Sequence, residues 1–332
     1  MGIGRKLVMR CARFYKKMDA IIMQRNYPML NGRLRKAAMV DGCLGVVFML
    51  HRVADYEKGR IKNNEDLKVS LQFLQQVIDK YRKGGFAFVS LDDVYELING
   101  TKSIDKPFVS FTMDDGYLDN YRNAYPVFKR NEVPFCIFVA SDFIDKKAIL
   151  WWYSIEELIL SHHTVSISDG TVYSCRTHQE KWDTFRYLRE RILKLDQKML
   201  LTSLNQMFAF YDIDWYAPVQ NMAMSWNEIE ELSKDGLCTI GGHTMSHPSF
   251  TSLSLDAIKD EIEGGNAVLE SHIHRKICHF AYPYGSPGED GPREYEFLKS
   301  FGFKTVFCSF GGCVRMCHKD QMTNLPRYML KK

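Results

Sequence analysis

The sequence contains no long run of apolar residues. Across its 332 residues, no stretch approaches the roughly 18 apolar residues that a membrane-spanning helix needs. The N-terminus also lacks the continuous apolar segment of a secretion signal, and internal repeats and low-complexity tracts are missing. We therefore expect a cytoplasmic protein.

The cysteines cannot all pair with one another, because the chain has nine of them. Several lie inside apolar runs, such as Cys136 in Val-Pro-Phe-Cys-Ile-Phe-Val, where a reduced thiol behaves as a small hydrophobic side chain. This usage is typical of a reducing compartment.

Hydrophobic residues make up 45% of the chain and charged residues 25%, which is ordinary for a globular protein and excludes a disordered one. The length fits either two domains or one α/β barrel with insertions. The number of domains must therefore come from the pattern along the chain.

Acidic residues are nearly absent from the first 36 positions, which carry ten Lys or Arg and one Asp. This segment has a net charge of +9, whereas the rest of the chain has −5. Apolar residues recur in it every three or four positions, as in an amphipathic helix. They are Leu7, Cys11, Phe14, Met18 and Ile21. We expect residues 1–40 to form a basic helical arm.

This arm has two interpretations. Residues 1–36 could contact an anionic membrane peripherally at its inner face, where a phosphorylated or lipid-linked glycan would suit the same charge. Alternatively, the apolar stripe could pack against the main domain with its charges in solvent. Nucleic acid is not expected as a partner, because the rest of the chain is net acidic and shows no recognition motif.

After the arm, short apolar runs alternate with amphipathic helical segments. The run from Leu44 to Leu50 predicts a buried strand, and Leu67 to Lys83 predicts a helix closed by glycines. Six further runs predict buried strands, at 87–91, 108–112, 135–140, 238–241, 277–281 and 304–308. Strands that alternate with helices imply a parallel sheet. We therefore expect an α/β fold in which residues 41–332 form an irregular (β/α) barrel of about seven parallel strands.

The segment from about 162 to 218 breaks this alternation. It contains a predicted hairpin that turns at Asp169 and Gly170, followed by a polar helical stretch from His178 to about Phe210. About 55 residues is small for an independent core. We therefore interpret the segment as a hairpin-plus-helix insertion in the barrel.

Two adjacent carboxylates follow the strand at 108–112, in Met113-Asp114-Asp115-Gly116-Tyr117. The C-terminal ends of barrel strands are where barrel active sites are built. Neighbouring side chains on an extended chain project differently, so one can bind a metal while the other acts as a base. Taken alone, Asp-Asp-Gly also fits an ordinary turn.

A pair of histidines follows the strand at 238–241. His243 and His247 are four residues apart and can face one cation if the segment is helical or tightly turned. Two histidines and one Asp leave coordination positions open, as in a catalytic metal site. Either histidine alone could cap a helix or line a loop, but together with the Asp pair they favour a metal site.

A third segment, Phe280-Ala281-Tyr282-Pro283-Tyr284-Gly285, also follows a predicted strand. Its aromatic and proline residues could form a rigid wall for a sugar ring, and a backbone N–H there could meet a developing oxyanion. We take Tyr282, Pro283 and, from the first motif, Tyr117 as candidates for substrate binding.

Together these three segments resemble the polysaccharide deacetylases, which are carbohydrate esterases with the NodB homology domain. The resemblance implies that Asp114 is the general base and that the backbone N–H of Tyr284 contributes to the oxyanion hole. It implies that Asp115, His243 and His247 bind a divalent metal. Zn²⁺ is the family's usual metal, and Co²⁺ or Ni²⁺ could occupy such a site.

The implied activity is the metal-dependent hydrolytic removal of an N-acetyl group from an acetamido sugar in a polysaccharide, glycolipid or surface-glycan precursor, with release of acetate. Such an enzyme is a hydrolase acting on carbon–nitrogen bonds other than peptide bonds, and its partner is an acetylated sugar or glycan. Two alternatives are an O-acetyl esterase acting on a glycan and a non-catalytic glycan-binding member of the same fold.

The chain departs from the family pattern in two places. Ala281 stands where many members have an Arg that orients the base, so the orientation of Asp114 must come from elsewhere. The Leu-x-His segment that supplies the general acid in many members has no clean equivalent, because His318 lies in a polar stretch typical of a surface loop. In a branch that includes poly-N-acetylglucosamine deacetylases, the acid is a His on the first strand, and the segment around His51 resembles it. We therefore expect His51 to be the acid, the alternative being a strand-end histidine bonded to backbone.

Two further groups of residues have ordinary interpretations. Cys308, Cys313, Cys317 and His318 could form a structural zinc site, but their spacing fits no tight zinc pattern. The aromatic residues at 151–153 open a predicted helix and could line a substrate groove, although core packing is the favoured interpretation.

Overall fold

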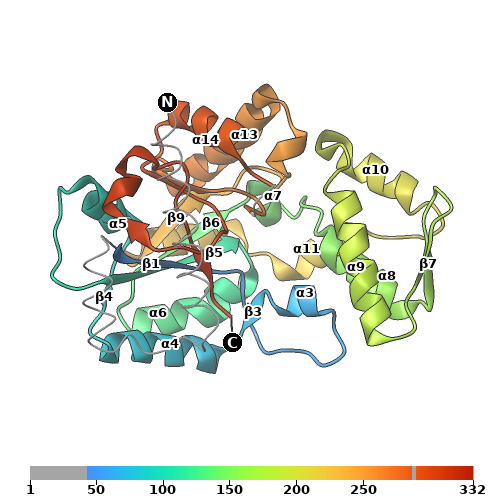
Figure 1. Ribbon diagram of the computed structural model, residues 1–332, viewed down its shortest axis with the longest axis horizontal. Helices are drawn as coiled ribbons and strands as arrows, with labels where there is room; N and C mark the ends of the chain where they lie inside the picture. The colour runs from blue at the N-terminus through green and yellow to red at the C-terminus, as the bar shows by residue number, and fades with distance from the viewer. Residues whose placement is uncertain (1–42, 286–288, 332) are drawn as a thin grey trace, which may run out of the picture.

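The computed structural model describes residues 43–285 and 289–331. The predicted basic arm, residues 1–40, lies outside the described residues. The described chain is built around one curled, mostly parallel β-sheet with helices packed against it (Figure 1). This arrangement confirms the predicted α/β class and the irregular barrel.

All seven predicted strands are present, and two short strands near the C-terminus join them. The sheet consists of β1 (Cys43–Leu50), β4 (Ala87–Phe88), β5 (Phe108–Asp115), β6 (Phe135–Val139), β9 (Cys238–Gly242), β10 (His279–Ala281), β11 (Thr305–Phe307), β12 (Val314–Arg315) and β13 (Tyr328–Met329). Its path runs β11-β10-β9-β6-β5-β1-β12, with β4 beside β5 and β13 beside β1. Within the described residues, every paired neighbour in this sheet is parallel except β1 and β12.

The segment from Met322 to Leu330 closes the barrel between β11 and β1. Its first part lies beside β11, where the N–H of Val306 donates to the carbonyl of Met322 (2.7 Å) and the N–H of Leu325 donates to that of Val306 (2.9 Å). Its last part contains β13, which pairs with β1, and the N–H of Leu330 donates to the carbonyl of Met49 (2.8 Å). The segment has only short apolar stretches, which is why the apolar pattern does not predict it.

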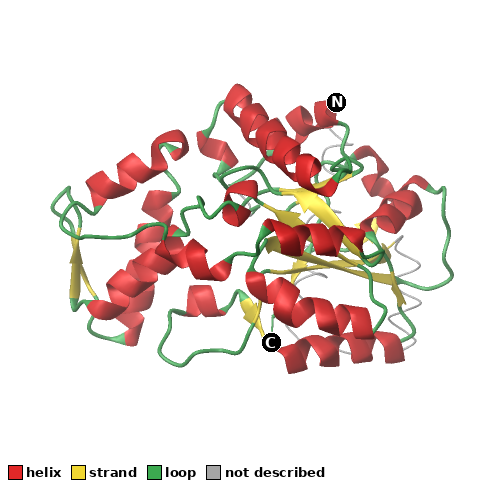
Figure 2. Ribbon diagram, turned by 180° about the vertical axis from the view of Figure 1, so that it is seen from behind, coloured by secondary structure: helices red, strands yellow, loops and turns green. Residues whose placement is uncertain are grey.

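The strands are buried by the helices that cover them, as expected for a parallel sheet. All eight residues of β5 are buried. The elements around the barrel are α4 (Leu71–Lys83), α5 (Leu91–Asn99), the π-helical η1 (Asn120–Ala124), α6 (Tyr125–Arg130), α7 (Ser141–Ile144), α12 (Trp226–Lys234), η3 (Phe250–Ser252), α13 (Leu255–Ile273), α14 (Pro292–Leu298), η4 (Lys299–Phe301) and η5 (Met316–Asp320). The view from behind shows helices on both sides of the strands (Figure 2). None of the described helices is both long and apolar enough to cross a membrane.

Helix α4 begins four residues later than the sequence predicts. Two short strands, β2 (Arg52–Val53) and β3 (Lys68–Val69), pair in parallel before it, and α3 (Lys62–Glu65) lies in the connection between them. Ser70 then caps α4, because its side chain accepts a hydrogen bond from the N–H of Phe73.

The inserted segment stands to one side of the barrel (Figure 1). It contains the predicted hairpin and two helices in place of one long helical stretch. Its elements are β7 (Thr164–Ser166), β8 (Val172–Ser174), α9 (His178–Ile192), η2 (Gln197–Met199) and α10 (Leu200–Met207), with α8 (Trp151–Ser161) before them and α11 (Ala217–Met222) after them. Buried residues of α9 and α10 belong to the same hydrophobic cluster as residues of β5 and β6. The core of the insertion is therefore continuous with that of the barrel.

Candidate metal centre and active site

The first and second motifs leave the sheet at the same edge. Asp115 ends β5, and His243 follows β9 directly. Strand β6 lies between these two strands, and its Val139 pairs with both Asp115 and Gly242. Because the carboxyl ends of parallel strands meet at one edge of a sheet, the two motifs come together there.

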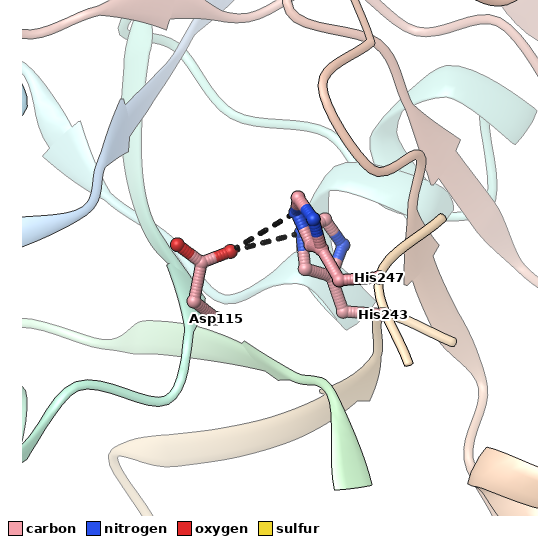
Figure 3. Close-up of side chains that lie close together, drawn as sticks. All are labelled: Asp115, His243 and His247. Carbon is pink, nitrogen blue, oxygen red and sulfur yellow. Dashed lines mark ion pairs between the residues drawn. The ribbon is translucent and has the colours of Figure 1, made fainter. Parts of the chain in front are cut away.

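Asp115, His243 and His247 face one another at this edge (Figure 3). The Nε2 atom of each histidine lies 3.3 Å from Oδ1 of Asp115. An ion held tetrahedrally with bonds of about 2.0–2.1 Å would place its ligand atoms about 3.3 Å apart. Oδ1 of Asp115 is buried and makes no well-aligned hydrogen bond to any described residue. The three side chains that the sequence predicts as ligands therefore fit a divalent cation.

The orientation of His243 is set by a neighbouring backbone carbonyl. Its Nδ1 lies 2.8 Å from the carbonyl oxygen of Ala281, at the end of β10. A carbonyl only accepts hydrogen bonds, so Nδ1 must carry the proton and Nε2 is left with its lone pair toward Asp115. Hydrogen bonds of this kind fix the tautomer and orientation of metal-binding histidines.

The loop that carries His247 is held by a carboxylate on α13. Oε2 of Glu261 accepts hydrogen bonds from the N–H groups of Met245 (3.1 Å) and Ser246 (2.8 Å). Within the loop, the N–H of His247 donates to Oγ1 of Thr244 (3.0 Å). The segment from His243 to His247 is therefore tightly turned and not helical. This is one of the two conformations that the spacing of the two histidines allowed.

Residues with a strained backbone conformation cluster around this centre. Four site residues adopt positive φ angles, namely Asp115 (80°), Thr244 (71°), His247 (62°) and Tyr284 (62°). Only three other non-glycine residues among those described do so. Residues other than glycine rarely adopt this left-handed conformation, and such strain clusters at functional sites.

Asp114 points to a different partner from its neighbour Asp115. Its two carboxylate oxygens accept hydrogen bonds from the two terminal nitrogens of Arg327, at 2.7 and 2.8 Å. Both side chains are almost completely buried. Burial alone would raise the pKa of Asp114, but the charge of Arg327 lowers it below its usual value. Asp114 is therefore held ionised and in a fixed orientation.

Arg327 lies in the segment that closes the barrel. Its guanidinium also donates to Oγ1 of Thr112 (3.0 Å) and to the carbonyl of Cys308 (3.1 Å). The rings of Phe138 and Phe307 lie 5.4 and 5.9 Å from its central carbon. Arg327 thus supplies the Arg that the third motif lacks at Ala281. The sequence offers no local signal for this pairing, because the two residues are 213 positions apart.

His51 follows β1 directly, and a hydrogen bond from η1 holds its backbone. Nδ2 of Asn120 donates to its carbonyl (2.8 Å), and Asp119 forms an ion pair with Arg52 (2.8 Å). Nδ1 of His51 is buried and has no hydrogen-bond partner among the described residues. Burial lowers the pKa of its imidazole, an effect that Asp115 opposes. The structure therefore does not show the alternative, in which the side chain of His51 would form a hydrogen bond to backbone.

A cavity of about 440 Å³ opens beside these groups. Asp115, His247, His51 and Tyr284 all line it. The ring of Tyr284 packs against that of His247, with centroids 4.7 Å apart. A cavity of this size lies in the range of small-molecule sites.

Three candidate substrate-binding residues lie behind this cavity. Tyr282 packs with Phe250 in a hydrophobic cluster, and its hydroxyl donates to the carbonyl of Thr323 (3.0 Å). Pro283 and Tyr117 are also buried, and none of the three lines the cavity. Because the chain turns sharply after Tyr282, Tyr284 reaches the cavity in its place. Substrate binding by Tyr282, Pro283 and Tyr117 stays a prediction.

The cysteine-rich alternative does not form a ligand group. Cys308 is buried and its thiol donates to Oδ1 of Asn324, whereas Cys317 is exposed. Nδ1 of His318 accepts the N–H of Arg315 (3.0 Å). Within residues 43–285 and 289–331, the Asp115 trio is the one group of His, Cys, Asp and Glu whose ligand atoms lie close enough to share an ion.

The chain is similar to known proteins in sequence and in fold. The family model for polysaccharide deacetylase matches residues 101–193 and 199–306, more than half of the chain. The chain belongs to the polysaccharide deacetylase family. A stretch of 112 residues is 26% identical to YxkH of Bacillus subtilis strain 168, whose curated name is that of a polysaccharide deacetylase. That match covers 34% of this chain and 39% of the relative, so it spans about two-fifths of the relative's length.

Three solved structures share the fold of this polysaccharide deacetylase family member over most of its length. IcaB from Ammonifex degensii is 22% identical, with a TM-score of 0.55 over 87% of this chain and 93% of that chain. The Streptococcus pyogenes deacetylase PplD, solved with acetate, is 14% identical, with a TM-score of 0.57 over 86% and 92%. A de-N-acetylase from Aggregatibacter actinomycetemcomitans is 13% identical, with a TM-score of 0.52 over 86% and 94%. These neighbours show that the fold is shared, and the family match shows the family.

Proposed function

We propose that this protein is a metal-dependent carbohydrate N-deacetylase, which hydrolyses the acetamido group of a sugar in a glycan or glycan precursor and releases acetate. One observation carries the proposal. An ionised carboxylate, Asp114, is locked by Arg327 directly beside three side chains that fit a divalent cation, two of which line a cavity. A separate base next to a metal centre is what the hydrolysis of an acyl group by water needs.

Asp115, His243 and His247 would hold the cation. When bound, a divalent cation at such a site polarises the acyl carbonyl and lowers the pKa of water toward neutrality. Zn²⁺ is the first candidate, and Co²⁺ or Ni²⁺ also suits two imidazoles and a carboxylate.

Asp114 acts as the general base in this proposal. It accepts a proton from the attacking water while the water oxygen bonds to the acyl carbon. Arg327 occupies one lone pair on each carboxylate oxygen, and each oxygen retains a second one for the proton. The backbone N–H of Tyr284 donates to the oxyanion that forms. His51 then gives a proton to the sugar nitrogen as the carbon–nitrogen bond breaks.

The position of His51 favours an N-acetyl over an O-acetyl substrate. An amine leaves an amide only when its nitrogen is protonated, so an amidase requires a positioned acid more strictly than an esterase does. His51 lines the same cavity as Asp115 and has an unpaired Nδ1.

Acetate release from matched N-acetyl and O-acetyl sugars, combined with metal analysis, tests the proposal. We expect about one divalent ion per chain, loss of activity with a chelator and recovery with Zn²⁺, Co²⁺ or Ni²⁺. Asp114→Asn should keep the metal and lose about 10²- to 10⁴-fold in turnover. Release from O-acetyl sugars alone would support the esterase. Binding of glycans without any acetate would support a non-catalytic member of the family.

Contact of residues 1–36 with an anionic membrane stays a prediction, as does a cytoplasmic location. Polyprenyl-linked acetamido sugars belong in the panel for this reason. If the arm binds anionic lipids, deletion of residues 1–30 should abolish binding to phosphatidylserine-containing vesicles. Unchanged binding after this deletion would contradict the prediction.

A further inference from the structure

The wall of the cavity contains polar atoms without hydrogen-bond partners among the described residues. Among the residues there is Trp152, whose ring lies beside that of His247, with centroids 5.8 Å apart. Trp152 of α8 and Asn63 of α3 both line the cavity. The side chain of Trp152 is 8% exposed, and its Nε1 has no hydrogen-bond partner among the described residues. Oδ1 of Asn63 is also buried and unpaired within the part of the chain that the structure describes. One atom can only donate, and the other can only accept.

The neighbouring Trp151, on the same helix, has a hydrogen-bond partner for its indole N–H. The missing partner is therefore particular to Trp152. Nε1 of Trp151 donates to the hydroxyl of Tyr284 at 3.1 Å. In the insertion, Nε1 of the buried Trp215 likewise donates to Oδ1 of Asn205 at 2.8 Å. An unpaired buried N–H is costly, and in a native protein it calls for an explanation. At the wall of a cavity, the explanation that the geometry offers is a ligand.

The two unpaired groups are held in place by a buried carboxylate. Glu156 of α8 is fully buried and accepts hydrogen bonds from the N–H of Ile61 (2.6 Å) and from Nδ2 of Asn64 (2.9 Å). Nδ2 of Asn64 also donates to the backbone carbonyl of Trp152 (3.0 Å). The segment that carries Asn63 is thus tied directly to the turn of α8 that carries Trp152. A site whose binding groups are fixed before the ligand arrives pays less entropy on binding.

We infer that Asn63 and Trp152 bind a hydroxyl-bearing part of the sugar whose acetamido group lies at the metal centre. The indole N–H donates to a ring hydroxyl oxygen, and the Asn63 carboxamide oxygen accepts a hydroxyl proton. A sugar hydroxyl can do both, whereas an apolar acyl compound can do neither. This inference rests on the proposed function and deepens it, because it makes the two residues determinants of sugar specificity.

The inference has a consequence for substrate choice. A site built to hydrogen-bond a hydroxyl discriminates strongly against an analogue that lacks it, because its own polar groups are then left unpaired. Removal of the indole N–H from the protein should therefore weaken selection for that hydroxyl, while the aromatic surface remains.

The test compares Trp152→Phe and Asn63→Leu with Trp215→Phe as the matched control. Each is measured for thermal stability, for binding of β-1,4- and β-1,6-linked N-acetylglucosamine pentamers by calorimetry, and for acetate release. Trp152→Phe loses buried ring volume but only an unpaired donor, so its melting temperature should fall less than that of the control. Its affinity for the bound pentamer, and its kcat/KM, should fall about 10- to 100-fold, mainly through KM. Asn63→Leu should act in the same direction.

Trp215→Phe should show the opposite pattern, with a lower melting temperature and unchanged binding, because it removes a paired donor far from the cavity. Binding and kcat/KM that stay at wild-type levels in Trp152→Phe would overturn the inference, as would a fall in melting temperature equal to that of the control. A wild-type protein that binds a pentamer without releasing acetate contradicts the proposed function alone. A wild-type protein that binds neither pentamer contradicts the inference for this class of sugar.

Discussion

Two groups of residues that line the cavity are built differently. On the side of the strand ends, Asp115 and His247 come from motifs that are short and local in the sequence, and they carry charge or metal-binding nitrogen. The second group, Asn63 and Trp152, is neutral, comes from elements far apart in the chain, and offers unpaired hydrogen-bonding atoms. The two groups are neighbours, since the ring centroids of Trp152 and His247 lie 5.8 Å apart. Under the proposed function, the comparison separates reaction chemistry from substrate recognition. Changes in the first group should remove the metal or the base, and changes in the second should alter affinity alone.

The largest effect is expected on the side of the strand ends. His243→Ala removes one of three ligands and should abolish both bound metal and acetate release. The measurement is metal content per chain together with turnover. The exposed His163 is the control, because His163→Ala should change neither. Full activity of His243→Ala would show that the trio is not the metal centre.

Arg327→Met should destabilise the fold by about 3–5 kcal/mol, because it leaves the buried Asp114 without a partner. Turnover should fall as well, since an unpaired buried carboxylate takes up a proton and can no longer act as a base. Chemical denaturation and acetate release measure the two effects. In contrast, Arg186→Met removes an exposed Arg from a pair with Asp183 and should cost almost nothing.

Two further variants separate positioning of the base from stability. Arg327→Lys keeps the positive charge but not the two-pronged contact, so it should recover more stability than turnover. The double change of Arg327→Met with Asp114→Asn should regain stability without activity. If Arg327→Lys has wild-type turnover, orientation by the guanidinium is not needed.

For the group of Asn63 and Trp152, Glu156→Ala should raise KM about 10-fold and lower stability by about 2–3 kcal/mol, because it leaves the N–H of Ile61 unpaired and frees the segment that carries Asn63. Bound metal should be unchanged. The adjacent Glu157 is exposed and serves as the control, since Glu157→Ala should leave KM at its wild-type value. Loss of metal in Glu156→Ala would mean that the two groups of residues are not separable.

The smallest effect concerns Asp142, beneath the loop that carries His247. Burial, Glu261 and Asp145 raise its pKa to about 6, and Lys147 opposes them. Because the folded pKa exceeds the unfolded one, the proton that Asp142 binds stabilises the fold at low pH, and this contribution is lost as the pH rises through 6. Asp142→Asn should therefore be more stable than wild type at pH 8, by about 1 kcal/mol after allowance for solvent screening, and no more stable at pH 4.

Urea unfolding at both pH values measures this difference. The exposed Asp212 is the control, because Asp212→Asn should not change the dependence of stability on pH. A gain in stability for Asp142→Asn that is the same at pH 4 and pH 8 would contradict the assigned cause.

Much of the barrel and the metal trio could be predicted because both depend on local patterns. An apolar run followed by polar residues predicts a strand and its functional end, and β5 with Asp115 follows this rule. Helix α4 shows the limit of such patterns, since the apolar residues before Ser70 belong to β3 and not to the helix. Tyr282 shows the same limit of local patterns, because the left-handed turn at Tyr284 brings the ring of Tyr284, and not that of Tyr282, to the cavity.

The sequence by itself determined the alternation of strands and helices and the three motifs, because each depends on residues only a few positions apart. Only the tertiary structure decided that Arg327 holds Asp114 and that Asn63 lies with Trp152 on one wall. Such pairs depend on how the barrel closes and how α3 docks on α8. Closure brings together residues that share no periodicity, so no spacing in the chain records their contact.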